Sequence, residues 1–580
     1  MLILIDMAYD GIITYAITRE LAGRITLGKI EKVYQPGPEE LLLHIHTRSG
    51  NVRLFISCNS QSARVCLTGG TYTNPDQPPT FCMLLRKHIQ AGRITDVRQK
   101  DSERIIEIDI EAQNELGFSV SRRLIVEIMA KHSNIVLIDI ESGKIIDAIK
   151  RISIDVNRYR RLLPGFIYQY PPEQDKIPFR EVTADTSLPG DDRQLMSRIG
   201  GISPAISREM AASDDPAARL VEIISSIDSG TAVPRVYIDE TSRSLQPSGD
   251  IGGIPREFHV TDLAEYDGLT RMDFGSVSEC VEFFFSNRET SNMVRQKSMP
   301  LLKTVQAAHS KALLKKKKLS EDLLSAENSD KYRLYGELLT ANIHMIRPGA
   351  RTARVTNYYD GNLIDIPLDE KINASANAQR YFKKYSKART AIHEKQAQLE
   401  DNEKDIQYLE SVIQNIEAAD SVPLLESIRD ELESAGYVRR RAKASQRKRK
   451  NARPEPHRYT LSDGTLVLVG RNNIENDYLT TKFASKTDVW MHTKDIPGSH
   501  VILQMKDGRT VNDLPAEIIY EAAAIAAYHS KAGTGSNVPV DFVPVRYVKK
   551  PAGSKPGMVI FTHNRTVYVD PALPDSKRDK

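Results

Sequence analysis

The pattern that decides the architecture lies in residues 392–416, which read IHEKQAQLEDNEKDIQYLESVIQNI. Apolar residues recur there at heptad spacing, with polar residues between them: Ile392, Leu399, Ile406, Leu409, Ile413 and Ile416. This a/d spacing is typical of a coiled coil. It predicts a helix that begins near Ser375 and ends near Leu432.

An upstream helical segment, 277–335, has the same heptad period, at Val305, Ala312, Leu319 and Ala326. Because two such segments can bury their apolar stripes against each other, we expect an antiparallel coiled-coil arm over 277–437. Between them, residues 343–368 have strand composition and the turn pairs Pro348-Gly349 and Asp360-Gly361. These features predict a small β tip. A two-stranded stalk of this kind has little enzymatic use and is suited to reaching and contacting a binding partner.

A strongly basic segment, 438–453, follows the arm and reads VRRRAKASQRKRKNAR, with nine Lys or Arg and no acid. The net charge of the whole chain is only +4, so this segment alone makes the chain basic. It is either a solvated linker or a contact with RNA phosphates, since clustered cations gain from counterion release. The candidates for an RNA-backbone contact are Arg447, Lys448, Arg449 and Lys450.

The N-terminal region, 1–175, alternates like a mostly β domain, with strands expected at 41–45, 52–56 and 105–110, a helix at 81–89 and a hairpin over 135–149. In the next unit, 176–235, Gly200-Gly201 joins two helices in a pattern that resembles a helix-hairpin-helix. These glycines would expose backbone N–H groups to a phosphate, although an ordinary αα-corner is the alternative. Residues 236–276 complete this region, and 454–575 form a separate C-terminal α/β domain. The fold class is therefore α+β multidomain.

The cysteine spacing and the first residues of the chain indicate in which cellular compartment the protein works. Cys58, Cys66, Cys82 and Cys280 stand apart without a CxxC pair, so neither a zinc site nor a disulfide framework is indicated. That usage fits a reducing compartment. The start of the chain lacks the features of a secretory signal, and Met7 is the natural start that we expect. A cytoplasmic protein with no membrane partner is predicted.

Motifs at both ends of the chain carry a family resemblance. The C-terminal domain contains, in order, Val469–Asn473, Asn476–Thr480, Asp488–His492, Lys494–Val501 and Lys549–Pro551. The N-terminal region contains Asp10–Ile12, Tyr34–Pro36, Met83–His88, Glu127–Met129, His132–Ile135 and Leu163–Gly165. Together they closely resemble the NFACT family over nearly the whole chain. The resemblance implies an NFACT-N domain with a DNA-glycosylase-like body and an RNA-binding NFACT-R domain.

The resemblance also implies a function. Such a protein binds a large ribosomal subunit obstructed by peptidyl-tRNA and recruits alanine tRNA, so that alanine is added to the stalled chain without a template. The ribosome would form the peptide bonds, the arm would reach the stalk base, and no cofactor would be needed. A second small RNA-binding quality-control factor is an expected partner. Family members are also named as fibronectin-binding surface proteins, which is the alternative function.

Candidate tRNA-binding residues follow from the same resemblance. The family's functional Asp-Arg pair coincides with Glu103-Arg104, where Glu replaces Asp. Glu127 and Met129, which strand alternation places together on a surface, and the cations Arg86 and Lys87 are further candidates. A strand-edge ion pair is the alternative for Glu103-Arg104.

The C-terminal domain offers an aromatic residue beside cations, which is how looped RNA is usually held. The candidates are Trp490, His492, Lys494, Ser499, His500, Lys549 and Lys550. A lone tryptophan is, however, more often a core residue. Catalysis is not predicted: Asp488, His492 and Ser499 lie in one short segment without a nucleophile elbow, and His492 and His500 have no third metal ligand at a familiar spacing. The N-terminus also lacks the nucleophile of a glycosylase.

Overall fold

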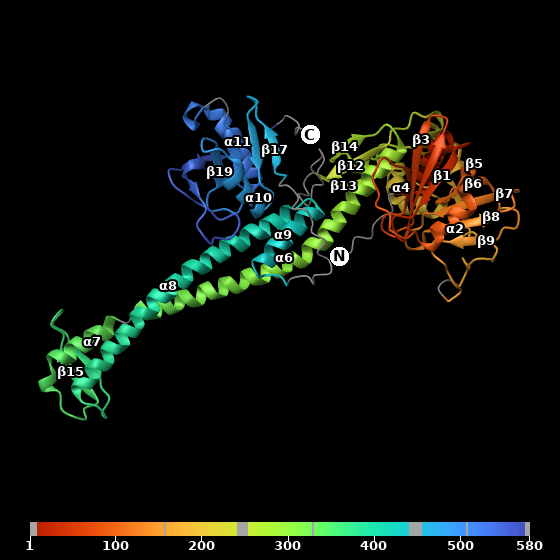
Figure 1. Ribbon diagram of the computed structural model, residues 1–580. Helices are drawn as coiled ribbons and strands as arrows, with labels where there is room; N and C mark the ends of the chain where they lie inside the picture. Colours follow the sequence, from red (N-terminus) through yellow and green to blue (C-terminus); the bar gives the residue numbers. More distant parts are fainter. Residues whose placement is uncertain are drawn as a thin grey trace. The chain divides into compact units, whose positions relative to one another are not determined.

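The computed structural model describes residues 9–155, 158–239, 253–327, 330–439, 455–505 and 509–574. The chain divides into two compact units, Met1–Asn292 and Met293–Lys580. Within the described ranges, no helix combines the length and the apolar character needed to cross a membrane. The architecture is mixed α/β and multidomain, with long helices and a C-terminal sheet domain (Figure 1).

The first unit is built on a nine-stranded antiparallel sheet in the order β4-β3-β2-β1-β5-β6-β7-β8-β9. Its strands are β1 (Lys29–Tyr34), β2 (Glu40–Thr47), β3 (Gly50–Ser57), β4 (Arg64–Leu67), β5 (Arg93–Gln99), β6 (Ile105–Gln113), β7 (Ser119–Glu127), β8 (Asn134–Asp139) and β9 (Ile145–Ala148). The strands and the hairpin expected from the sequence are confirmed, because alternating apolar residues bury one side of each strand.

Two helices pack on this sheet, α1 (Gly11–Ile25) and α2 (Thr80–Ile89). The sequence predicts α2 but not α1. The reason is that α1 is buried around most of its circumference, so it lacks the amphipathic period that reveals a surface helix. The side chains of Ile13 and Ile17 join those of Phe81 and Leu85 in one continuous core.

The opposite side of β6–β9 is covered by an irregular segment that follows β9 and includes Ile152, Leu162 and Tyr168. Leu162 and Tyr168 of this segment join Ile105, Ile125 and Val136 of the sheet in a second buried cluster. A backbone bridge between Ile152 and Leu162 holds the segment in an extended conformation. Both sides of this part of the sheet are therefore shielded from water.

A helical unit and a small sheet complete the first unit. The helices are α3 (Asp192–Arg198), α4 (Pro204–Ala211) and α5 (Pro216–Ser229), and β10 (Ile177–Pro178) pairs with β11 (Ile199–Gly200). The small antiparallel sheet has the order β13-β12-β14, with β12 (Arg235–Asp239), β13 (Ile254–His259) and β14 (Thr270–Asp273).

Long helices dominate the start of the second unit: α6 (Val277–Glu327), which begins in the first unit, then α7 (Asp330–Ala341), α8 (Ala374–Ala418) and α9 (Val422–Ser434). The helix expected from Ser375 to Leu432 is in fact two helices, because the backbone leaves the helical region at Ala419, where ψ is 123°, and α9 begins at Val422 with Pro423 in its first turn. In Figure 1, α8 lies along α6 toward α7 and β15.

Cross-contacts show that α6 and α8 run antiparallel. Asn402 Nδ2 donates to the carbonyl oxygen of Ala312 at 2.9 Å. Lys316 pairs with Glu403 at 2.8 Å, and Lys395 pairs with Asp322 at 2.7 Å. At the end of this arm, β15 (Thr352–Thr356) and β16 (Leu363–Pro367) form a hairpin that shares a small core with α7 and α8.

The C-terminal sheet has six antiparallel strands in the order β17-β18-β20-β19-β21-β24. They are β17 (His457–Thr460), β18 (Leu466–Val469), β19 (Val489–Thr493), β20 (Val501–Leu503), β21 (Val538–Pro544) and β24 (Arg565–Val569). Helix α11 (Ala516–Tyr528) packs on one side. The other side is covered by residues near α10 (Asn473–Tyr478) and by the pair β22 (Val548–Lys549) and β23 (Ile560–Phe561).

Candidate nucleic-acid interface

The Glu103-Arg104 pair lies in the tight turn between β5 and β6, where Asp101 adopts φ +49°. Gln99 Nε2 fixes this turn by donating to the carbonyl oxygens of Gly11 at 2.9 Å and Glu103 at 2.8 Å. Gly11 N in turn donates to the carbonyl oxygen of Gly201 at 2.7 Å. The structure therefore brings together the β5–β6 turn, the start of α1 and the α3–α4 turn.

Glycine is required where these elements meet. A Cβ on Gly11 would lie 2.5 Å from the carbonyl oxygen of Ser102, and one on Gly201 would lie 2.3 Å from the same atom. Gly201 also has φ +84°, which L side chains rarely adopt. The backbones consequently approach more closely than any side chain would allow.

Asp10 occupies the position that the sequence suggests for a phosphate. Its carboxylate caps α1 by accepting from Ile13 N at 2.8 Å, and it accepts from Ser203 N at 3.2 Å. The N–H at the start of α4 therefore serves an internal carboxylate. The prediction that this turn offers its N–H groups to a phosphate is wrong for Ser203.

The electrostatics of this corner are unusual for a protein surface. Burial alone would raise the pKa of Asp10, but hydrogen bonding and charge from His259 lower it overall. Burial lowers the pKa of Arg104, and the charges of Asp10 and Glu103 counteract part of that effect. Arg104 is thus a half-buried cation on which the charges of two carboxylates act.

Glu127 was expected at the surface, and the structure corrects this. Its side chain is 0% exposed. Its two carboxylate oxygens accept from Arg160 at 2.6 and 2.5 Å, and Oε1 also accepts from the Tyr168 hydroxyl at 2.6 Å. The strand alternation is correct, but the irregular segment that covers this side of the sheet is distant in sequence.

Met129 is also not a free surface residue, because it is half-buried and packs against the cluster beneath this segment. Ile128 N donates to the carbonyl oxygen of Arg104 at 2.9 Å, so the Glu127–Met129 motif does lie beside the Glu103-Arg104 turn. Sequence reasoning missed Arg160 and Tyr168. The run Arg158-Tyr159-Arg160-Arg161 was the available signal.

Arg86 and Lys87 lie on α2 and have structural contacts. Arg86 Nε donates to the carbonyl oxygen of Val33 at 2.9 Å, and its guanidinium lies 5.6 Å from the Tyr34 ring centre. Lys87 is exposed and pairs with Glu115 at 2.8 Å. Of the two, Lys87 is the more exposed, and a ligand that bound it would replace its ion pair with Glu115.

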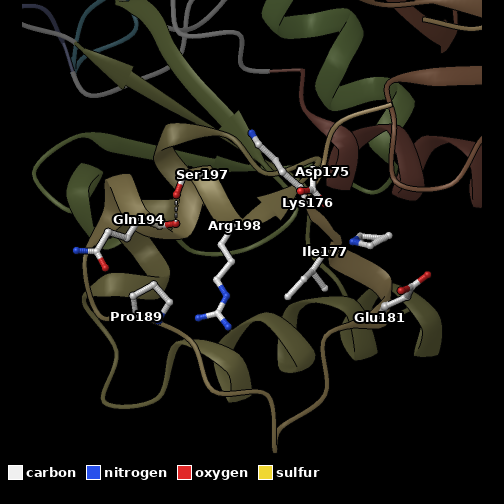
Figure 2. Close-up of a pocket in the computed structure, with 9 residues that line it drawn as sticks. Asp175, Lys176, Ile177, Glu181, Pro189, Gln194, Ser197 and Arg198 are labelled. Atoms are coloured by element: carbon white, nitrogen blue, oxygen red, sulfur yellow. Dashed lines mark hydrogen bonds between the residues drawn. The ribbon is translucent and has the colours of Figure 1, made fainter. Parts of the chain in front are cut away.

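A cavity of about 600 Å³ lies beside the pair β10–β11 and α3. Figure 2 shows the Arg198 guanidinium directed into it, whereas Ser197 points toward the carbonyl oxygen of Gln194, to which it donates at 2.8 Å. Asp175, Lys176 and Glu181 also line the cavity. The lining carries both signs of charge, so it does not select an anion.

In the C-terminal domain, Trp490 is a core residue, which contradicts the prediction that it stacks on RNA. It is 1% exposed and its ring centre lies 4.8 Å from that of Phe561. The reason is its place on β19, a central strand between β20 and β21 whose two sides are both covered.

His492 and His500 are equally unsuited to hold RNA as cations. His500 is 3% exposed, and its Nδ1 lies 2.8 Å from the Thr480 hydroxyl. Burial lowers the pKa of His500 to about 3 and also lowers the pKa of His492. Both rings are therefore neutral at physiological pH. Asp488 is not directed at His492, because its carboxylate accepts from Ser485 N and Met505 N, both at 2.8 Å.

The other C-terminal candidates differ in availability. Lys494 and Lys549 are exposed, and Ser499 is half-buried. Lys550 forms an ion pair with Asp477. Of these four, Lys494 and Lys549 remain candidates for RNA contact. The basic candidates Arg447, Lys448, Arg449 and Lys450 lie outside the described residues.

The structure also shows exposed cations that sequence reasoning missed, besides the candidate Lys549. Lys482, Lys486 and Arg546 are exposed, and so is Lys549. Arg546 N donates to the carbonyl oxygen of Lys486 at 3.2 Å, and the Arg546 guanidinium lies 5.0 Å from the Tyr547 ring centre. In the described part of the chain these four cations have no ion-pair partner. The run Arg546-Tyr547-Val548-Lys549-Lys550 was a usable signal.

Comparison with known proteins gives matches over nearly the whole chain. A family model described as NFACT N-terminal and middle domains matches residues 10–451, and one described as NFACT protein RNA binding domain matches residues 455–563. The chain is 37% identical over 574 residues to the Rqc2 homolog RqcH of Bacillus subtilis, covering 97% of this chain and 98% of that protein. It is 34% identical to the Rqc2 homolog RqcH of Streptococcus suis, covering 97% and 98%.

Two solved structures match separate parts of the chain. The N-terminal part of the fibronectin/fibrinogen-binding protein from Streptococcus suis is 30% identical and covers 48% of this chain and 99% of its own, with a TM-score of 0.41. The C-terminal part of that protein is 35% identical and covers 48% and 96%, with a TM-score of 0.38.

Proposed function

The chain belongs to the NFACT family, and from this premise we propose that it is a non-enzymatic RNA-binding factor of ribosome-associated quality control in the cytoplasm. It would bind large ribosomal subunits obstructed by peptidyl-tRNA and recruit alanine tRNA. Alanine would then be added to the stalled chain without a template, and the ribosome would form the peptide bonds. No cofactor is required for this role.

The observation that carries the proposal is the placement of Arg104. Arg104 lies in the β5–β6 turn, where three chain segments meet, and the charges of Asp10 and Glu103 act on it. An arginine in this environment is suited to grip a base edge or a phosphate with two hydrogen bonds. The first unit, for which the family resemblance implies a glycosylase-like body and the sequence pattern resembles a helix-hairpin-helix, would supply the tRNA site.

The remaining parts fit the same proposal. The exposed cations Lys482, Lys486, Arg546 and Lys549 form a surface to which an RNA backbone could bind. The arm would reach the stalk base of the subunit, the basic segment 438–453 would contact ribosomal RNA, and a second small RNA-binding factor would act alongside. The fibronectin-binding alternative is not better supported, because the relatives that match over 97% of this chain are named RqcH.

The test is the variant Arg104→Ala. Loss of one bidentate RNA contact costs on the order of 1–3 kcal/mol, so tRNA affinity should fall roughly tenfold to hundredfold. Alanine tailing should be lost while thermal melting and binding to large subunits are unchanged. Glu103→Asp, which restores the family's usual acid, should be mild.

Arg48→Ala is the matched control, because Arg48 is an exposed arginine of the same unit, in the β2–β3 hairpin. Normal tailing by Arg104→Ala would remove Arg104 from the site, and a collapsed melting temperature would assign it a structural role instead. Sequencing of the RNA that co-purifies with the full chain would identify the tRNA that is selected.

A further inference from the structure

The segment 158–168 presents aromatic and basic side chains to solvent. Tyr159 is 82% exposed, Phe166 is 43% exposed and Ile167 is 64% exposed. Arg158 and Arg161 are exposed as well, and neither has an ion-pair partner in the described part of the chain. The Arg161 guanidinium lies 5.5 Å from the Phe166 ring centre. Aromatic rings beside uncompensated cations are the usual equipment for holding unpaired nucleotides.

A buried clamp beneath the surface fixes this segment. Arg160 is 7% exposed and Leu162 is 0% exposed, so Tyr159 and Arg161 alternate outward while their neighbours point inward. Arg160 donates two hydrogen bonds to the carboxylate of Glu127, and Tyr168 donates a third. A bidentate arginine–carboxylate pair has strict geometry, so it determines where the outward side chains lie.

The segment also borders the Glu103-Arg104 turn. Ile105, the residue after Arg104, is the direct register partner of Glu127 in the β6–β7 pair. Tyr170 donates a hydrogen bond to Glu107 of β6, and Lys100 Nζ of the turn lies 5.5 Å from the Tyr170 ring centre. The clamp and Arg104 thus lie at the same end of the paired strands β6 and β7.

We propose that the outer side of segment 158–168 is a second part of the tRNA site, which takes unpaired bases of a tRNA loop. Tyr159 and Phe166 stack on the bases, and Arg158 and Arg161 neutralise the adjoining phosphates. Glu127 does not touch RNA but acts as a positioning residue through Arg160. This inference rests on the proposed function, since it assumes that tRNA binds at Arg104.

The first experiment measures the affinity of the full chain for an alanine tRNA transcript across a salt series. Loss of one base–aromatic stack costs about 1–3 kcal/mol, so Tyr159→Ala should weaken binding roughly tenfold to hundredfold, and Tyr159→Phe should retain it. Arg161→Ala should weaken binding and reduce the salt slope by about one. Phe118→Ala and Arg48→Ala are matched controls at exposed positions of the same unit, and Phe118 is 66% exposed.

The outcomes separate the inference from the proposed function. One outcome is that Arg104→Ala loses tRNA while the two loop variants, Tyr159→Ala and Arg161→Ala, bind tRNA like the controls. In that case the outer side of segment 158–168 is excluded from the tRNA site, while the proposed function stands. If wild-type protein and Arg104→Ala bind tRNA equally, the proposed site itself falls. Loop variants that keep tRNA affinity but lose large subunits would show a different docking surface and also overturn the inference.

A second experiment tests the positioning role of Glu127. In Glu127→Gln, trypsin should cleave after Arg158 and Arg161 faster than in wild type, and tRNA affinity should fall as in the loop variants. Because a single substitution leaves Arg160 as a buried charge and can unfold the region, Glu127→Gln/Arg160→Gln provides a version without buried charge. A folded double variant with rapid tryptic cleavage of the loop and unchanged tRNA affinity would overturn the positioning role.

Discussion

Glu431 is a carboxyl group with almost no access to water, at the contact between the arm and the C-terminal domain. It is 4% exposed, and its Oε1 accepts from the Tyr408 hydroxyl at 2.8 Å and from Asn473 Nδ2 at 3.0 Å. Burial raises its pKa to about 7, although these hydrogen bonds oppose the rise, and Asp477 and Lys550 add charges of opposite sign nearby. The Val469–Asn473 motif thus serves docking to the arm within the second unit.

This environment predicts a pH dependence with a definite sign. The folded state retains the proton of Glu431 between its ordinary pKa of 4.5 and about 7, whereas the unfolded state releases it. The free energy of unfolding should therefore fall as the pH rises through that window, by about 3 kcal/mol at most, since one pKa unit corresponds to about 1.4 kcal/mol. Glu431→Gln should be more stable than wild type at pH 8 and similar at pH 5.

The measurement is hydrogen exchange of the α9 amides at pH 5, 6 and 8, corrected for the intrinsic exchange rate. Glu417→Gln is the matched control, because Glu417 is an exposed carboxylate on the neighbouring helix α8. An identical pH profile of protection in wild type and Glu431→Gln would contradict the role assigned to this carboxyl group.

At the same scale, individual buried polar residues show where sequence reasoning fails. Trp490 and Glu127 were predicted as RNA contacts, and both are buried. Alternation along a strand identifies which residues share a side, but not which distant segment covers that side. Leu162 and Tyr168 belong to the segment that covers Glu127, and strands β8 and β9 separate this segment from Glu127 in the sequence. Phe561 packs against Trp490. The Glu103-Arg104 pair was proposed from the family resemblance, and its role in binding stays a prediction.

Among the elements, the junction of α1, the β5–β6 turn and the α3–α4 turn depends on Gly201. Gly201→Ala should be strongly destabilising, because it combines a φ of +84° with a Cβ 2.3 Å from a backbone oxygen. Backbone strain and overpacking each cost about 1–3 kcal/mol. Thermal melting should show the loss, and tRNA binding at Arg104 should fall with it.

The matched control for Gly201→Ala is Gly23→Ala in α1. A Cβ at Gly23 meets nothing within 4 Å, and alanine in a helix is favoured over glycine by about 0.5–1 kcal/mol. The control should therefore be slightly stabilised. If Gly201→Ala melts like its control, the close approach of the three elements does not limit stability.

Helix prediction at this scale depended on amphipathicity. The heptads of α6 and α8 were read from the sequence because one stripe of each helix is apolar. The uniformly apolar α1 was missed, and the break at Ala419 between α8 and α9 was not anticipated. The polar Asn402 lies three residues after Leu399, at a d position, where its hydrogen bond to Ala312 joins the two arm helices. A polar residue at an a position is known to fix the register of a coiled coil, and Asn402 provides a comparable polar contact at a d position.

For the whole molecule, charge is concentrated in the basic segment 438–453, whose nine cations exceed the net charge of +4. Replacing Arg447, Lys448, Arg449 and Lys450 with Ser should weaken binding to large ribosomal subunits and flatten its salt dependence, because fewer counterions are released. Sedimentation with large subunits over a salt series measures this. Unchanged sedimentation at every salt concentration would count against an RNA contact by this segment.

The arm allows a deletion that follows its own geometry. Lys395 Nζ lies 2.7 Å from Asp322 Oδ2, so the two helices are side by side at that level. Removing residues 323–394 and joining Asp322 to Lys395 through a short glycine-rich turn should therefore retain the base of the arm. The deleted part carries its own core, including Leu338, Val355 and Ile366, so its removal exposes little of the remaining protein.

If the arm provides reach to the stalk base, the shortened protein should bind free tRNA as well as wild type and lose most of its association with large subunits. The pairs His309–Glu410 and Lys316–Glu403 remain in it, and hydrogen exchange over α6 and α8 can confirm that the base is still folded. A control with the same glycine-rich turn inserted between Asp360 and Gly361, in the exposed tip hairpin, tests the effect of the turn itself. Normal pelleting of the shortened protein with large subunits would show that subunit binding does not depend on the length of the arm.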